Sequence, residues 1–152
     1  MRIEEKITID APRHLVWNYV TEPANYPVFM EGLTRWRVEG DRHSGLGARY
    51  RMLIRVGAAE MGGLIEIVEW QPEGDMAWSS VTGVDQRGRW RLREQTDGCT
   101  RVTFRFAYGV HGFGLTGLIA EHVAARSLRR QFKQSMRNIK AAVEEQAKVA
   151  AS

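Results

Sequence analysis

The chain has 152 residues, of which 43% are hydrophobic and 26% charged, and its formal net charge is +4. This composition is ordinary for a globular domain and excludes a chain that is disordered over most of its length. The length suits one domain with a continuous core. The N-terminus lacks the apolar core of a signal peptide, and no apolar run approaches the ~18 residues of a membrane span, so we expect a cytoplasmic protein.

A strand and two short helices are the first predicted elements. Isoleucines alternate with polar residues over residues 3–9, which is the period of a half-buried strand. Asp10-Ala11-Pro12 favours a helix start, because proline is tolerated in the first helical turn. Glu22-Pro23 ends this helix, and a second brief helix is expected over residues 26–30.

Six further strands are predicted between residues 33 and 109, where apolar residues recur with a period of two. Turn sequences rich in Gly, Asp and Pro separate them. Because these connections are short, successive strands should pair as antiparallel neighbours. The residues that define these strands are Trp36 and Val38; Tyr50, Met52, Ile54 and Val56; Ile65 and Ile67 or, alternatively, Leu64 and Val68; Met76 and Trp78; Trp90 and Leu92; and Val102, Phe104, Phe106 and Tyr108.

A helix of about thirty residues, with an apolar stripe along one face, is predicted after the break at residues 112–114. Such a helix can bury its stripe only against the concave face of the sheet, which makes the chain an α+β protein. We expect one domain over residues 1–146 and a frayed tail over residues 147–152. The stripe consists of Leu115, Leu118, His122, Ala125, Leu128, Phe132, Met136, Ile139 and Val143.

Cysteine and histidine positions argue against two kinds of site. Cys99 has no partner cysteine in the chain, so neither an internal disulfide nor a thiolate metal cluster can form. His14, His43, His111 and His122 are scattered over a helix start, two loops and the long helix, without the spacing of a ligand pair. We therefore expect no metal and no cofactor.

Five short motifs follow one another along the whole chain: Ile9-Asp10-Ala11-Pro12 with Val16-Trp17, Gly45-Leu46-Gly47-Ala48-Arg49-Tyr50, Val68-Glu69-Trp70-Gln71-Pro72, Gly88-Arg89-Trp90, and Gly98-Cys99-Thr100-Arg101-Val102-Thr103. Together they resemble the START-like (SRPBCC) superfamily, and within it the bacterial group of polyketide cyclase/dehydrase-like proteins. The resemblance implies a helix-grip fold, in which a curved antiparallel sheet of seven strands wraps around the C-terminal helix and two short helices join strands one and two. It also implies an apolar cavity between sheet and helix. It does not imply catalysis, because the superfamily mixes carriers, sensors and enzymes.

Strand parity and helix spacing place many bulky side chains between the sheet and the long helix. These side chains either fill the space as a close-packed core or line a pocket of about 300–1,000 Å³, and the resemblance favours the pocket. The candidate ligand-binding residues are Trp17, Tyr26, Phe29, Met30, Tyr50, Met52, Ile54, Trp78, Ser80, Trp90, Leu92, Phe104, Phe106, Tyr108, Leu118, His122, Phe132 and Met136.

The leading functional hypothesis is binding or transport of a hydrophobic small molecule, such as a lipid or a polyketide-like or aromatic compound. The alternative is a polyketide aromatase, cyclase or dehydrase in which His122 and a tyrosine, Tyr108, act as acid and base. A histidine on an apolar stripe can equally be a core residue with one hydrogen-bond partner, so His122 is a candidate catalytic residue only.

Arg87, Arg89, Arg91 and Arg93 alternate along one strand and share its convex face. In a second alternative function this face contacts an anionic membrane or an acidic protein. The plainer interpretation is a solvated surface with cross-strand ion pairs. We expect no nucleic acid partner, because the aromatic residues that could stack on bases point inward. The protein is expected to be a monomer or a homodimer.

Overall fold

The structure is a computed structural model that describes residues 1–109 and 114–152, without the side chains of residues 114–122. Within the described residues, no helix has both the length and the apolar character needed to cross a membrane. The elements are β1 (Arg2–Ile9), α1 (Arg13–Thr21), the 3-10 turn η1 (Pro23–Asn25), α2 (Tyr26–Phe29), β2 (Leu33–Glu39), β3 (Arg49–Val56), β4 (Ala59–Gln71), β5 (Asp75–Gly83), β6 (Gln86–Glu94), β7 (Thr100–Tyr108) and α3 (Gly114–Ala151).

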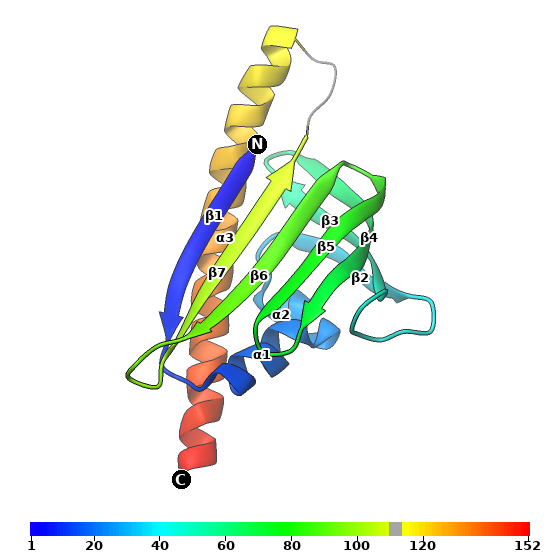
Figure 1. Cartoon of the computed structure of the whole chain (residues 1–152). Helices are drawn as coiled ribbons and strands as arrows, with labels where there is room; N and C mark the ends of the chain where they lie inside the picture. The colour runs from blue at the N-terminus through cyan, green and yellow to red at the C-terminus, as the bar shows by residue number, and fades with distance from the viewer. Residues whose placement is uncertain (110–113) are drawn as a thin grey trace.

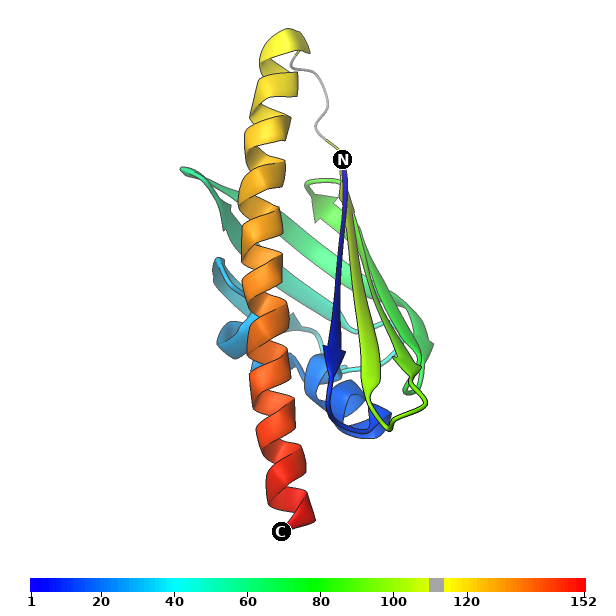
Figure 2. The ribbon, with the colours of Figure 1, turned by 90° about the vertical axis from the view of Figure 1, so that its left-hand side faces the viewer.

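All seven strands belong to one curved antiparallel sheet with the order β1-β7-β6-β5-β4-β3-β2 (Figure 1). Each strand from β2 to β7 pairs with its neighbour in the chain, as the short connections predict. β1 departs from this order because the segment with α1 and α2 carries the chain across to the other edge of the sheet. α3 lies along the concave face, as the turned view in Figure 2 shows. The expected α+β helix-grip architecture is confirmed.

Two glycines near the start of β4 bring it close to the strands on both sides. Gly62 and Gly63 have φ angles of 153° and 151°, and a Cβ atom on either would lie 2.1 or 2.2 Å from a backbone oxygen of a neighbouring strand. Only glycine allows this close approach of strands. Two register shifts between β4 and β5 follow farther along, so Ile65 and Ile67 face the interior while Val68 is 50% exposed. This arrangement corresponds to the first of the two alternatives that the sequence left open.

The core lies between the concave face of the sheet and the stripe of α3. Trp90 at its centre is fully buried, and its ring centroid lies 4.3 Å from that of Phe104. α3 ends at Ala151, a little beyond the predicted helix, because Ala147 still packs against the core. Fraying of residues 147–152 in solution stays a prediction.

Candidate functional site

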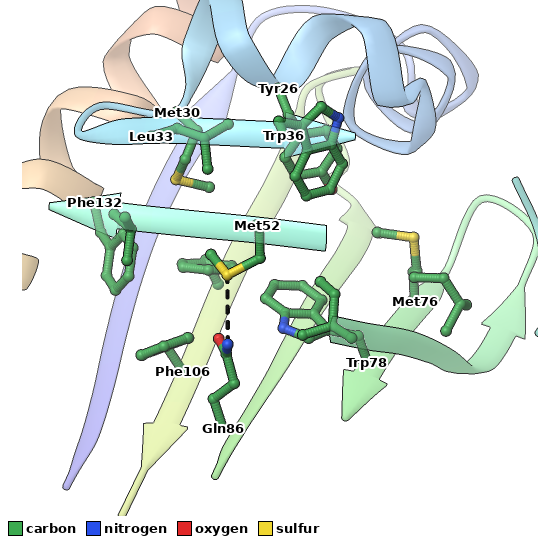
Figure 3. A pocket seen from close by; sticks show the side chains of 14 residues that line it. Tyr26, Met30, Leu33, Trp36, Met52, Met76, Trp78, Gln86, Phe106 and Phe132 are labelled. Atoms are coloured by element: carbon green, nitrogen blue, oxygen red, sulfur yellow. Dashed lines mark hydrogen bonds between the residues drawn. The ribbon is translucent and has the colours of Figure 1, made fainter. Parts of the chain in front are cut away.

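A small cavity lies between the concave face of the sheet, α2 and α3 (Figure 3). Its volume is about 40 Å³, which is enough for a water molecule but far below the ~300 Å³ of typical small-molecule pockets. The interior is therefore mostly filled in this conformation. The lining residues are Tyr26, Met30, Leu33, Trp36, Met52, Ile54, Ile65, Ile67, Met76, Trp78, Gln86, Phe104, Phe106 and Phe132.

Aromatic rings form the wall between the sheet and α3. Phe132 on α3 meets Phe104 and Phe106 of β7 edge to face, with centroid distances of 4.9 and 5.2 Å. Phe104 also stacks on Trp78 of β5 at 5.7 Å. These residues come together because their strands place every second side chain on the concave face. Such contacts fix the rings in defined orientations and account for the small free volume.

Methionines and a leucine give the cavity a more adaptable wall on the other sides. Met52 and Met76 are buried, whereas Met30, directly after α2, and Leu33, the first residue of β2, are half-buried. Methionine side chains rotate easily and fill irregular spaces. Met30 and Leu33 are therefore the lining residues whose movement would most readily connect the cavity with solvent.

Polar side chains of α3 hold the connection between α2 and β2 in place. Ser135 Oγ accepts a hydrogen bond from the backbone N–H of Glu31 at 2.8 Å, and Asn138 Nδ2 donates to the carbonyl of Phe29 at 3.1 Å. Both residues lie next to the apolar stripe, one helical turn apart. They fix the position of the α2–β2 connection relative to α3 and keep the cavity nearly closed.

Among the described lining residues, Tyr26 has an ionisable side chain, and this side chain is buried. Its hydroxyl donates to the carbonyl of Val20 at 2.8 Å and accepts from Trp90 Nε1 at 3.1 Å. Burial raises the pKa of the Tyr26 phenol well above its ordinary value. Tyr50, outside the cavity, has its pKa raised to about 12, first by burial and then by the negative charge of Glu22. Neither phenol is poised to exchange a proton near neutral pH.

Two polar side chains of the cavity wall lack strong hydrogen bonds. Trp78 is 8% exposed, and its Nε1 has no hydrogen-bond partner within the part of the chain that the structure describes. Gln86 is 2% exposed, and the amide Nε2 donates to the sulfur of Met52 at 3.4 Å, a weak acceptor (Figure 3). Buried polar groups are nearly always paired, so these two differ from the hydroxyl of Tyr26 and the indole N–H of Trp36 in the same wall, which have strong partners.

Eight of the sequence-predicted ligand-binding residues line the cavity. They come from α2 and the residue after it, from the strands or from α3. The sequence predicts them because every second side chain along a strand faces inward, and at these positions the side chains are aromatic or aliphatic. They are Tyr26, Met30, Met52, Ile54, Trp78, Phe104, Phe106 and Phe132.

The other predicted residues do not line the cavity or lie outside the described side chains. Ser80 lies beside a register shift in β5 and accepts a hydrogen bond from the backbone N–H of Gln86 instead. Tyr108 is buried at the end of β7, and the side chain of its predicted catalytic partner His122 lies outside the described residues, as does that of Leu118. Those that belong to the hydrophobic core without lining the cavity are Trp17, Phe29, Tyr50, Trp90, Leu92 and Met136.

Six lining residues were not among the candidates. Gln86 has the same parity as Trp90 and Leu92 on β6, so its inward position could have been read from the sequence, but a polar residue is usually placed outside. Leu33 and Trp36 of β2 were not predicted to line the cavity, because a register shift near Leu33 interrupts the alternation. The six are Leu33, Trp36, Ile65, Ile67, Met76 and Gln86.

Ion pairs within the chain balance part of the positive charge on the convex face of β6. Asp75 of β5 forms ion pairs with Arg89, Arg91 and Arg93, and Arg89 also pairs with Glu69. Burial favours the protonated form of Asp75, but hydrogen bonds from the three arginines outweigh it and hold the pKa of this carboxyl below its ordinary value. Docking of a membrane or an acidic protein through Arg87 and its neighbours stays a prediction.

Comparison with known proteins relates this architecture to a family and to several solved structures. The family described as "Polyketide cyclase / dehydrase and lipid transport" matches residues 1–144. The protein TTHA0849 from Thermus thermophilus is 17% identical, with a TM-score of 0.81 over 100% of this chain and 99% of the other. No protein of curated function matches the chain.

Two further similar structures carry names that state an activity. The Zhui aromatase/cyclase from Streptomyces sp. R1128 is 18% identical, with a TM-score of 0.71 over 100% of this chain and 96% of the other. The di-domain ARO/CYC StfQ from the steffimycin biosynthetic pathway is also 18% identical, with a TM-score of 0.74 over 96% of this chain and 51% of the other. At these identities the likeness is one of fold.

Proposed function

Because the chain belongs to the polyketide cyclase/dehydrase and lipid transport family, we propose that its cavity binds a hydrophobic small molecule of the lipid, polyketide-like or aromatic class. The observation that carries this proposal is the composition of the cavity wall. Of its 14 described lining residues, Gln86 alone is neither aliphatic, aromatic nor methionine. Binding of an apolar ligand to such a wall is favourable, because it removes apolar surface from water.

Ligand entry requires the cavity to grow from about 40 Å³ to the volume of the ligand. Met30 and Leu33 are half-buried at its edge, and Met52 and Met76 face its interior. Rotation of the three methionine side chains costs little free energy, because methionine has several accessible rotamers. The aromatic wall on the side of Phe132 stays in place, and the connection between α2 and β2 moves, which breaks the hydrogen bonds that it makes with Ser135 and Asn138.

Aromatase or cyclase activity is the second candidate, favoured by the names of two similar structures. Chemistry at the cavity would need an acid or base near neutral pH. Among the described lining residues, Tyr26 carries the ionisable side chain, and burial raises its pKa far from neutrality. Catalysis would therefore depend on His122, with Tyr108 as its predicted partner. Replacement of His122 by alanine should abolish turnover while leaving ligand affinity unchanged, and unchanged turnover would exclude this role.

Ligand binding is tested by native mass spectrometry of gently purified protein and by titration with the neutral apolar fluorescent probe N-phenyl-1-naphthylamine. Leu33→Trp should fill the edge of the cavity and weaken probe binding at least about tenfold, which corresponds to the ~1.4 kcal/mol of a few lost apolar contacts. Val28→Trp is the matched control, because Val28 is 73% exposed and does not line the cavity. An empty wild-type protein that takes up no probe, or equal binding by both variants, would contradict the proposal.

A further inference from the structure

The cavity wall contains a hydrogen-bond donor that the described residues leave unused. Trp78 Nε1 is buried and has no partner among them, although the ring atoms next to this nitrogen, Cε2 and Cζ2, lie close to the backbone of Gly88. Indole N–H groups are donors only, so this atom can be satisfied only by an oxygen or another acceptor. Trp36, the second tryptophan of the cavity, differs in that its Nε1 donates to the carbonyl of Pro23 at 2.8 Å.

Gln86 places a second polar group beside this donor. Figure 3 shows the indole nitrogen on the side of the Trp78 ring that faces Met52 and Gln86. β5 and β6 pair so that Trp78 lies opposite Gly88, two residues from Gln86 on the same face of β6. The only hydrogen bond of the Gln86 side chain with described residues is the weak one to Met52 Sδ. Both N–H groups are thus available at one end of an apolar cavity.

We propose that the bound ligand carries a neutral carbonyl oxygen, as in a ketone, quinone or ester, which accepts hydrogen bonds from Trp78 Nε1 and Gln86 Nε2. This inference rests on the proposed ligand-binding function. The carbonyl must be uncharged, because the described lining residues include no lysine, arginine or histidine to balance a carboxylate. The rest of the ligand is apolar and contacts the aromatic and methionine side chains.

A water molecule is the competing occupant of this end of the cavity. The free volume of about 40 Å³ can hold one, and two N–H donors with an amide oxygen would give it partners. Water would satisfy the same groups without any preference among ligands. The proposal therefore requires that a carbonyl oxygen raises ligand affinity, which water alone does not predict.

A matched pair of probes separates these cases. 9-Fluorenone and fluorene have nearly the same size and shape, but only fluorenone has a carbonyl oxygen. Wild-type protein should bind fluorenone about tenfold more tightly by isothermal titration calorimetry. Trp78→Phe should reduce this preference, because Gln86 Nε2 alone remains to donate to the carbonyl, and should retain fluorene binding. Trp36→Phe is the matched control, because it replaces an indole of the same wall whose N–H already donates to the carbonyl of Pro23. This variant should keep the preference for fluorenone.

A spectroscopic readout in the wild-type protein covers the case in which Trp78→Phe does not fold. The indole N–H proton of Trp78 should shift downfield in ¹H–¹⁵N spectra with fluorenone and not with fluorene. If both probes bind equally and the indole proton does not respond, the carbonyl site is wrong while ligand binding stands. If neither probe binds, the proposed function fails and this inference fails with it.

Discussion

Trp90 Nε1 donates a hydrogen bond to the hydroxyl oxygen of Tyr26 over 3.1 Å, between two residues 64 positions apart in the chain. The Tyr26 hydroxyl in turn donates to the carbonyl of Val20 at 2.8 Å, so one chain of hydrogen bonds joins β6, α2 and α1. Trp90 is completely buried and Tyr26 is 8% exposed. This link fixes the helical segment that closes one end of the cavity.

Tyr26→Phe should lower the free energy of unfolding by about 1–3 kcal/mol, because it leaves the buried Trp90 Nε1 without an acceptor. Urea denaturation at pH 7 measures the change. Tyr50→Phe is the control: its hydroxyl donates to the carbonyl of His43 in a part-buried position, where water can replace the lost donor. The larger loss must belong to Tyr26→Phe, and equal losses would mean that the link to Trp90 contributes little.

Gly88→Ala should destabilise the fold by about 1–3 kcal/mol through overpacking. A Cβ atom at this position would lie 1.9 Å from the Cζ2 atom of Trp78, and the indole ring would have to leave its stack on Phe104. Thermal and urea melts report the loss. Gly74→Ala provides the comparison, since its Cβ would meet the nearest atom, the oxygen of Gln71, at 3.5 Å. A Gly88→Ala variant as stable as Gly74→Ala would show that the ring moves freely.

Asp75→Asn should lower the free energy of unfolding at pH 7 by about 1–3 kcal/mol, because three arginines would lose their shared carboxylate. Urea denaturation measures the loss. Glu4→Gln removes an exposed carboxylate paired with Lys6 and Arg105, and should cost less stability than Asp75→Asn because solvent screens this ion pair.

The contribution of Asp75 should also depend on pH in a defined direction. Its pKa in the folded protein lies below that of an unfolded aspartate, about 3.9, so the unfolded chain takes up the proton first as pH falls. The stabilisation is complete above about pH 5, declines as pH falls through this range, and is lost below the pKa of the folded state. The difference between wild type and Asp75→Asn should therefore shrink from about pH 5 to about pH 3. A difference that stays constant would assign the effect to packing.

The eight predicted residues that line the cavity were accessible to sequence reasoning because the alternation of side chains along a strand is local. Phe104 and Phe106 on β7 share their parity with no interruption. Inward-facing residues were harder to predict in irregular strands, because register shifts in β4 and β2 change which side chains face inward. In β4 the sequence did not decide whether Ile65 and Ile67 or Leu64 and Val68 face the interior. Asp75, the shared partner of three arginines, was also not predicted, because the register between β5 and β6 decides that it lies opposite Arg91.

The sequence by itself determined the order of the elements, the antiparallel sheet and the apolar stripe of the long helix, because these follow from local periodicity and short connections. Only the tertiary structure decided that the cavity is as small as about 40 Å³ and that, among the described residues, Trp78 Nε1 lacks an acceptor while those of Trp36 and Trp90 have one. Free volume and hydrogen-bond pairing depend on distances of a few tenths of an ångström between side chains from distant segments. Periodicity along a single segment carries no information about these distances.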